Sequence, residues 1–220
     1  MRPSQTTARH SKVESPVLPQ ATLDLIRPVF GWMGRGFWHL KQRGLENIPA
    51  AGGLIIAANH QSYLDPFLIS IPIQRPLRFL AWSEALEWPV AGKMMKLMGA
   101  WPLQLQGSDP GAIRRSIQWL RDAGALVIFP EGGRGLPNGS MVRFKGGAVR
   151  LALEADVPIL PVTISGANRV WPAGKLVPRM GQIEVVYHPL HQVIQREGEE
   201  TRECARRESD QLAEIIKSAL

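Results

Sequence analysis

The sequence predicts an α/β fold in which helices flank a largely parallel central sheet. Apolar runs of about five residues alternate with segments whose apolar side chains recur every three or four positions. The first pattern is typical of buried strands and the second of amphipathic helices, and their alternation favours a layered α/β fold. The chain has 220 residues, 45% of them hydrophobic, which is enough to bury a core as a single domain.

The first 41 residues are expected to stand apart from this alternation. Residues 1–20 lack a long apolar run, so we expect a flexible tail followed by one domain over 21–220. Residues 21–41 have the apolar spacing of a helix and carry Trp and Phe, and the basic residues beside them are Arg27, Arg35, Lys41 and Arg43. This N-terminal apolar helical segment suits a membrane interface, and packing on the protein's own core explains it equally well.

The strands and helices of the domain follow in order. We expect strands over residues 53–58, 77–82, 125–129, 159–164 and 182–187. We expect helices near residues 65–71, 84–98, 110–123, 146–155 and 198–219. In folds of this class, functional side chains lie where strands end and loops begin.

Charge and cysteine content indicate which partners and which cellular compartment to expect. Residues 1–195 carry 21 basic and 12 acidic side chains, a net charge of +9, whereas residues 196–220 carry five basic and seven acidic ones. A basic body attracts phosphates, whether of nucleic acid, anionic lipid or a small molecule. The single cysteine, Cys204, forms neither an intramolecular disulfide nor a Cys-rich zinc site, which favours a reducing, cytosolic setting. The five histidines show no metal-ligand pattern, so we expect no metal.

One motif follows the first apolar strand. The stretch "NHQSYLD" places His60 and Asp65 five residues apart, and "DP" at 65–66 is a helix-start signal with aspartate at the N-cap. A carboxylate on one imidazole nitrogen leaves the other nitrogen free to accept a proton, as a general base must. The competing interpretation is that Asp65 only caps its helix and His60 is an incidental turn residue.

A second motif repeats this logic. In "LVIFPEGGRG", residues 126–135, a buried strand ends and a glycine-rich loop with Glu131 and Arg134 follows. Glycines allow close approach of the backbone to a ligand, and a guanidinium suits a phosphate. Arg143 and Lys145 add nearby cations. A surface turn with a salt bridge explains the same residues. The loop matches neither a nucleotide P-loop nor a serine-hydrolase elbow.

Taken together, these stretches resemble the lysophosphatidate and glycerophosphate acyltransferase family. Four ordered blocks between about Gly44 and Gly166 carry the resemblance: "NHQSYLD" (59–65), "GAWPLQLQ" (99–106), "FPEGGRG" (129–135) and "VPILPV" (157–162). The second and third blocks each depart from the family pattern. Gln104 and Leu105 stand where an acidic residue and an arginine usually end the second block, and Gly135 stands where the third block usually has serine.

The resemblance implies an acyl transfer in which His60 is the general base and Asp65 its partner. The donor is acyl-CoA or acyl-carrier protein, and the acceptor is a lyso-phospholipid such as 1-acyl-glycerol-3-phosphate, with no further cofactor. The expected acceptor-binding residues are Asn59, Glu131, Gly132, Gly133, Arg134 and Lys145. The two departures leave room for a different acceptor, for example an ornithine-type lyso-lipid.

Such substrates require an apolar slot and a membrane partner. Residues 82–101 supply Met94, Met95 and Met98 as candidates to line the slot, with ordinary core packing as the alternative. We expect a peripheral protein on the cytoplasmic face of a membrane, without a nucleic-acid partner. Two other classes remain open: a non-catalytic module that binds anionic lipid or nucleic acid, and a hydrolase that uses His60 to activate water on a thioester.

Overall fold

A computed structural model describes residue 18 and residues 20–89, 91–104, 109–136, 138–172, 175 and 177–220. Most of the expected tail, residues 1–20, lies outside these described residues, as does Leu105. Within them, seven strands form one sheet in the order β1-β7-β6-β2-β5-β3-β4. The strands are β1 (Lys41–Arg43), β2 (Leu54–Ala58), β3 (Leu77–Trp82), β4 (Ala100–Leu103), β5 (Ala125–Ile128), β6 (Ile159–Ser165) and β7 (Glu184–Tyr187).

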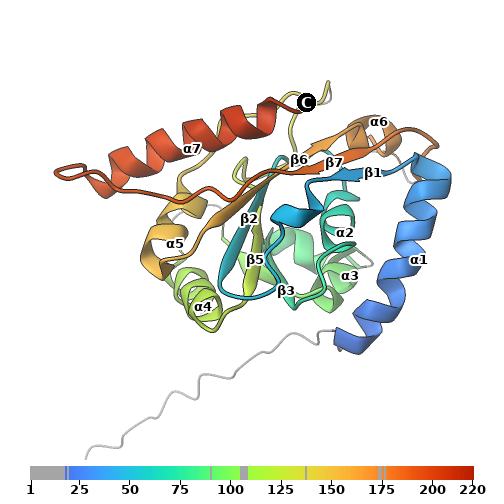
Figure 1. Cartoon of the computed structure of the whole chain (residues 1–220). Coiled ribbons are helices and arrows are strands. Elements are labelled where there is room, and N and C mark those ends of the chain that lie inside the picture. Colours follow the sequence, from blue (N-terminus) through green and yellow to red (C-terminus); the bar gives the residue numbers. More distant parts are fainter. Residues whose placement is uncertain are drawn as a thin grey trace, which may run out of the picture.

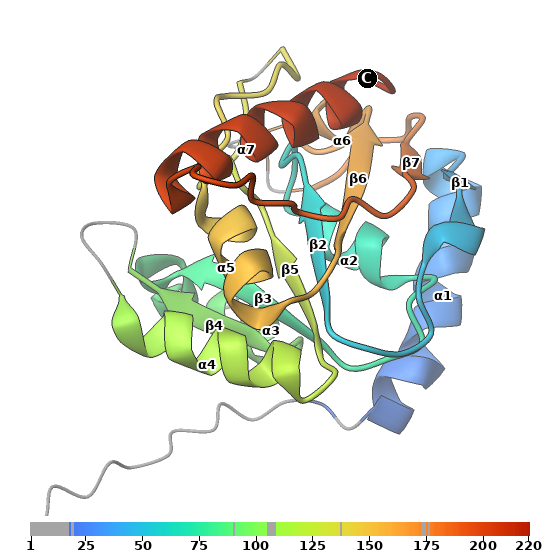
Figure 2. The same ribbon diagram turned by 60° about the vertical axis from the view of Figure 1, so that its left-hand side comes forward.

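The sheet is mostly parallel, as predicted. Every neighbouring pair runs parallel except β6 and β7. The strands β1 and β4 were not predicted. β1 is only three residues long, and β4 contains Pro102, which an edge strand tolerates but which hides the strand pattern in the sequence. β2 lies between β6 and β5 at the centre of the sheet, so the residue that follows it is surrounded by other loops (Figure 2).

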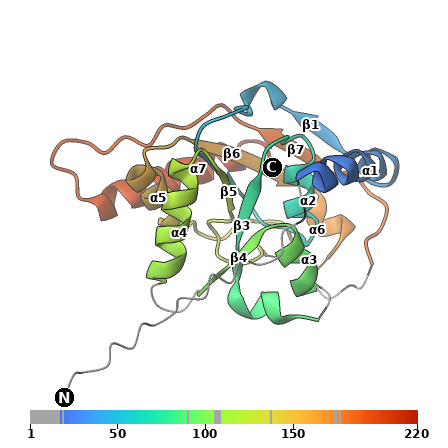
Figure 3. The ribbon, with the colours of Figure 1, turned by 90° about the horizontal axis from the view of Figure 1, so that it is seen from below.

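Helices cover both faces of the sheet (Figures 1 and 3). One face carries α1 (Gln20–Trp38), α2 (Asp65–Ser70), the 3-10 helix η2 (Ser83–Glu87), α3 (Ala91–Leu97) and α6 (Ala167–Val170). The other face carries α4 (Pro110–Arg121), α5 (Gly147–Ala155) and α7 (Thr201–Lys217). A short 3-10 helix, η1 (Leu45–Asn47), precedes β2.

The alternation of side chains along β2 explains this two-layered core. Leu54 and Ile56 pack in the cluster beneath α1 and α2, whereas Ile55 and Ala57 pack in the cluster beneath α4 and α5. Successive strand residues point to opposite faces, and a strand covered on both faces must be apolar throughout. All five residues of β2 are fully buried, as the continuous apolar run predicts.

Two predicted helices differ from the structure. The helix expected over 84–98 is divided into η2 and α3, because Pro89 has no N–H to donate and disfavours helical geometry at Trp88. The segment expected as a helix over 21–41 is helical only to Trp38. His39 then takes a positive φ of 41°, and residues 41–43 join the sheet as β1.

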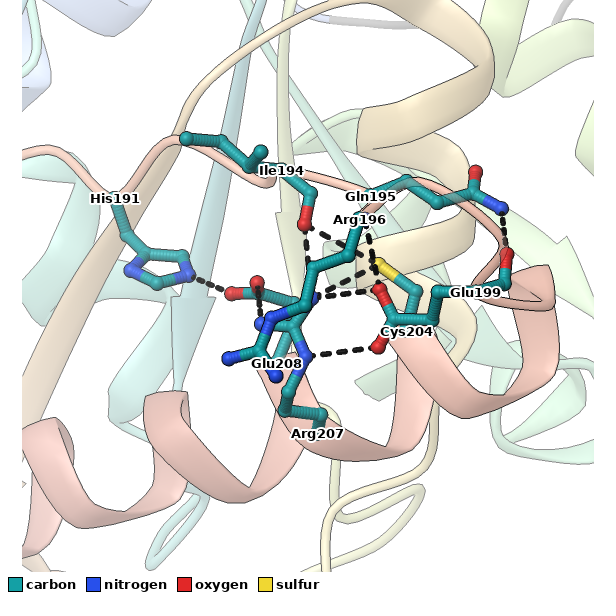
Figure 4. Close-up of polar contacts among 8 residues, drawn as sticks. All are labelled: His191, Ile194, Gln195, Arg196, Glu199, Cys204, Arg207 and Glu208. Carbon is teal, nitrogen blue, oxygen red and sulfur yellow. Dashed lines mark hydrogen bonds and ion pairs between the residues drawn. The ribbon is translucent and has the colours of Figure 1, made fainter.

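The C-terminal helix α7 is fixed by a cluster of charged groups that lies along its buried side (Figure 4). Arg207 donates two hydrogen bonds to Glu199, at 2.8 and 2.9 Å, and a further one to Glu208. Glu208, which is buried, also contacts Nε2 of His191 at 2.5 Å. The cluster therefore joins α7 to the segment that follows β7.

We predict that Glu199 makes the stability of the fold sensitive to acid. Hydrogen bonds from the Arg207 guanidinium lower the pKa of Glu199 from 4.5 to about 2. A depressed pKa in the folded state stabilises the fold above pH 4.5, and this contribution is lost as the pH falls toward 2. We expect Glu199→Gln to flatten the decline in the free energy of unfolding between about pH 5 and 3, measured by urea titration. The exposed Glu197→Gln variant is the control, and equal slopes for the wild type and Glu199→Gln would contradict the prediction.

Candidate active site

His60 and Asp65 meet at the carboxyl end of β2. His60 follows the strand after one residue, and Asp65 is the first residue of α2. The turn between them brings Nδ1 of His60 to 2.8 Å from Oδ2 of Asp65. The carboxylate is fully buried, while the imidazole is 19% exposed. In the neutral tautomer in which Nδ1–H donates this hydrogen bond to Asp65, Nε2 keeps a lone pair that can accept a proton.

The carboxylate of Asp65 also shapes the turn. Its Oδ2 accepts hydrogen bonds from the backbone N–H groups of Gln61, at 2.6 Å, and Ser62, at 2.7 Å. The predicted N-cap role of Asp65 is therefore wrong. Leu64 precedes the helix, and the aspartate side chain turns back toward the residues before it. Together with the contact to His60, these two hydrogen bonds fix the orientation of the carboxylate and of the imidazole.

The second motif lies directly against the first. β5 pairs with β2 in parallel register, so the residues that follow both strands share one edge of the sheet. The ring of Phe129 stacks on the imidazole of His60, with 4.1 Å between ring centroids and 20° between planes. The N–H of Gly135 donates to the carbonyl oxygen of His60 at 2.6 Å. Residues 59–65 and 129–135 therefore form one site.

Glu131 is buried in this contact. Its Oε1 accepts the backbone N–H of His60 at 2.8 Å, and its Oε2 accepts the N–H of Val142 at 2.9 Å. Burial raises the pKa of the Glu131 carboxyl, and the two N–H donors act against that shift. Both oxygens thus have backbone partners, which differs from the expectation that Glu131 contacts an acceptor.

Arg134 lies on the exposed side of the same loop. Its guanidinium carbon is 4.1 Å from the ring centroid of Tyr63, which sits between His60 and Asp65 in the chain. Tyr63 in turn makes edge contacts with Trp88 and Trp171. Stacking uses the flat face of a guanidinium and leaves its in-plane N–H groups directed elsewhere. The arrangement can therefore present a bidentate donor to an anion.

Two of the three glycines of the loop, Gly132 and Gly133, have different surroundings. Gly132 has a φ of +73°, and a side chain there would lie 2.5 Å from Nζ of Lys145. The absence of a side chain thus allows the Lys145 ammonium to pack against the loop that carries Arg134. Gly133 is exposed and has no atom near the position of a Cβ. The side chain of Lys145 therefore lies against the same loop that carries Arg134.

Asn59, which the resemblance assigned to acceptor binding, is engaged within the protein. Asn59 is fully buried, its Nδ2 donates to the carbonyl oxygen of Ile164 at 2.8 Å, and its Oδ1 accepts the N–H of Ile164 at the same distance. Both ends of the side chain are engaged by β6. Asn59 thus anchors the turn that carries His60 to a neighbouring strand.

Two other expectations concern the second block and metals. Gln104 follows β4, and its N–H donates to Asp109 at 3.2 Å, the residue that caps α4. Leu105, the other departure from the family pattern, lies outside the described residues. In the described part of the chain, no group of three or more His, Cys, Asp or Glu side chains is placed to hold a metal ion.

Two residues of this site escaped the sequence interpretation: Tyr63 and Phe129. Tyr63 occupies one of the positions between His60 and Asp65 that the motif leaves open. Phe129 ends an apolar run, so the sequence predicts that it is a core residue. Their contacts with Arg134 and His60 join side chains that are distant in sequence, so only the pairing of β2 with β5 reveals them.

Comparison with known proteins agrees with this geometry. A family model described as acyltransferase matches residues 39–165. The chloroplastic 1-acyl-sn-glycerol-3-phosphate acyltransferase LPAT1 of Arabidopsis thaliana is 28% identical over 160 residues, which cover 70% of this chain and 44% of that protein. The 1-acyl-sn-glycerol-3-phosphate acyltransferase of Pseudomonas aeruginosa is 33% identical over 168 residues, which cover 74% of this chain and 62% of that protein.

A solved structure extends the similarity to the fold. The crystal structure of the 1-acyl-sn-glycerophosphate (LPA) acyltransferase PlsC from Thermotoga maritima aligns with a TM-score of 0.68 and 27% identity, over 91% of this chain and 78% of that one. The chain spans less than half the length of the plant and algal relatives that it matches, 44 to 46%. The family model covers more than half of the chain and includes both motifs of the site. The chain belongs to the acyltransferase family.

Proposed function

We propose that the chain transfers a fatty acyl group from acyl-CoA or acyl-carrier protein to a hydroxyl of a lyso-phospholipid such as 1-acyl-glycerol-3-phosphate. The observation that carries the proposal is the 2.8 Å contact between His60 Nδ1 and the buried carboxylate of Asp65, beside a loop that presents Arg134. The two relatives and the solved structure described above, whose names state this acyltransferase activity, support the choice of acceptor.

The proposed reaction needs one base and no covalent intermediate. Nε2 of His60 takes the proton of the acceptor hydroxyl while Asp65 stabilises the imidazolium that forms. The acceptor oxygen attacks the thioester carbonyl, and collapse of the tetrahedral intermediate expels the thiolate of the donor. The proton held by His60 then passes to that thiolate. The products are the acylated lipid and the free thiol of CoA or carrier protein.

Arg134 and Lys145 are the proposed ligands of the acceptor phosphate. Both cations lie at the loop that adjoins His60, and Tyr63 supports the flat face of the Arg134 guanidinium. A guanidinium matches the geometry of a phosphate with two parallel hydrogen bonds, whereas an ammonium acts as a point charge.

We expect Arg134→Ala to raise KM for a phosphate-bearing acceptor by about tenfold or more, with a smaller change in kcat. The proposed contact binds the acceptor phosphate in both the ground state and the transition state. Its loss therefore raises KM and changes kcat little. The measurement is initial rate against acceptor concentration, with Arg206→Ala on the exposed face of α7 as control. An unchanged KM would remove Arg134 from the phosphate site.

We further propose that the outer face of α1 contacts the membrane, with the protein peripheral on its cytoplasmic face. Leu25 and Trp32 are each 75% exposed, Val29 lies on the same stripe, and Phe37 near the end of the helix is also exposed. Arg35 is exposed beside them, but Arg27 is not: it is buried on the inner side of α1, where it pairs with Asp24. No helix in the described ranges is long and apolar enough to cross a bilayer. An interfacial helix with exposed Trp and nearby basic residues suits a lipid surface.

Trp32→Ser is expected to lower partitioning into vesicles of phosphatidylglycerol and phosphatidylethanolamine by roughly 30-fold, since a fully buried aromatic side chain contributes about 2 kcal/mol and about 1.4 kcal/mol is tenfold. Co-sedimentation at several lipid concentrations gives the partition coefficient. Ile194→Ser removes a comparably exposed side chain, 66% exposed, from another region and serves as the control. Equal partitioning of Trp32→Ser and wild type would place membrane contact elsewhere.

The experiment that tests the function is release of the free thiol from acyl-CoA, and in parallel from acyl-carrier protein, across a panel of lyso-lipids. The panel includes 1-acyl-glycerol-3-phosphate, an ornithine-type lyso-lipid and a control without acceptor. Release that depends on one acceptor, with formation of its acylated product, supports transfer and identifies that acceptor. Equal release without acceptor would instead indicate a hydrolase, and no release with either donor would favour a binding module.

A further inference from the structure

We propose that Glu131 is a positioning residue that holds the backbone of His60, and not a ligand of the acceptor. The proposal rests on the proposed role of His60 as general base. Glu131 is 5% exposed, and each of its carboxylate oxygens already accepts a backbone N–H, from His60 at 2.8 Å and from Val142 at 2.9 Å. A buried carboxylate with two short N–H partners would lose both bonds by turning toward a substrate.

The segment that carries Glu131 holds His60 at three points. Phe129 stacks on the imidazole, Glu131 accepts the N–H of His60, and the N–H of Gly135 donates to its carbonyl oxygen. The ring and both backbone polar groups of His60 are thus fixed by residues about 70 positions away in the chain. The orientation of a general base affects rate steeply, because a misplacement of about 1 Å can cost about 100-fold.

The second oxygen of Glu131 extends this support to another segment. Val142 belongs to the chain that returns toward α5, and Lys145 in that chain donates its N–H to the carbonyl oxygen of Pro130 at 2.8 Å. One carboxylate therefore joins the turn after β2 to the chain before α5. Only a carboxylate offers two acceptor oxygens, whereas a glutamine would direct its NH2 group at one of the two N–H donors.

Gly135 makes room for this arrangement. A Cβ at position 135 would lie 2.9 Å from the carbonyl oxygen of Ser140 and 3.1 Å from Oε2 of Glu131. A side chain there would displace either the turn or the carboxylate. The departure from the family's usual serine at this position is thus matched to the position of Glu131 in this chain.

The test is a kinetic comparison of Glu131→Gln with the wild type, using the free-CoA assay and 1-acyl-glycerol-3-phosphate. We expect kcat to fall about 10- to 100-fold, because one of the two N–H donors loses its acceptor, while KM for the acceptor changes less than about threefold. We also expect faster amide hydrogen exchange at His60 or Val142, measured without substrate. Glu154→Gln, at an exposed site on α5, is the matched control.

Four results decide the proposal. A fall in kcat with a flat KM and faster exchange supports it. A rise in KM with kcat unchanged overturns it, because that is the behaviour of an acceptor ligand, and an unchanged kcat overturns it as well. If Glu131→Gln does not fold, Gly135→Ala carries the test, with the same fall in kcat expected and an unchanged kcat contradicting the proposal.

Failure of the positioning role of Glu131 can be distinguished from failure of the proposed function. A folded His60→Ala variant with normal turnover refutes the role of His60, whatever Glu131 does. An inactive His60→Ala variant beside a fully active Glu131→Gln variant refutes only the positioning role. If Glu131 acts through His60, Glu131→Gln will cause little further loss in a His60→Ala background, since residues that act as a unit are not additive.

Discussion

Replacement of His60 by alanine will lower kcat for acyl transfer by about 100-fold or more. In the proposed mechanism the imidazole takes the acceptor proton, and the carboxylate of Asp65 is not placed to replace it because it is fully buried. The fold should survive, since the backbone N–H and carbonyl oxygen of residue 60 keep their bonds to Glu131 and Gly135. Only the contacts of the ring itself, with Asp65 and Phe129, are removed.

The measurement is turnover in the free-CoA assay at saturating acceptor, together with a thermal melt followed by circular dichroism. His39→Asn provides the control, because His39 is exposed and its φ of 41° is one that asparagine tolerates. Turnover close to that of the wild type in a folded His60→Ala variant would exclude His60 as the base.

Asp65→Asn is the second variant with a large expected effect, a loss of about 100-fold or more in kcat at neutral pH with KM nearly unchanged. The amide oxygen can take the place of Oδ2 and accept the N–H groups of Gln61 and Ser62, so the turn should persist. The amide nitrogen then takes the place of Oδ1, which has no hydrogen-bond partner among the described residues. What is lost is the negative charge that stabilises the imidazolium.

Comparison with Asp65→Ala separates charge from structure. Alanine removes the acceptor as well as the charge and leaves buried N–H groups unpaired, so we expect a lower melting temperature for Asp65→Ala than for Asp65→Asn. Activity of the asparagine variant within about threefold of the wild type would show that the charge of Asp65 does not assist His60.

The order of elements and the location of the site were accessible from the sequence. Short, fully apolar runs such as residues 54–58 favour central strands, because a strand buried on both faces is apolar throughout. Parallel pairing then brings the residues after β2 and β5 to one edge of the sheet. His60, Asp65 and Arg134 were predicted to share a site for this reason, and the structure places them together.

The use of each polar side chain within the site was not accessible in this way. Asn59 and Glu131 both follow buried strands and carry hydrogen-bonding groups, so the sequence made them equivalent candidates to contact an acceptor. Both side chains are buried in the fold, and a polar group removed from water must find its partner inside the protein. The partners of these two side chains are backbone groups far along the chain, at Ile164 and at His60 and Val142.

The sequence by itself determined the α/β class of this protein, the order of five of its strands and of the main helices along the chain, and the segments proposed to carry its chemistry, because periodicity and residue type are local properties. The tertiary structure alone decided which strand neighbours which, and hence that Phe129, Glu131 and Gly135 hold His60 while Tyr63 supports Arg134. Contacts of this kind join residues some 70 positions apart. They arise from sheet pairing and burial, which depend on the whole chain at once.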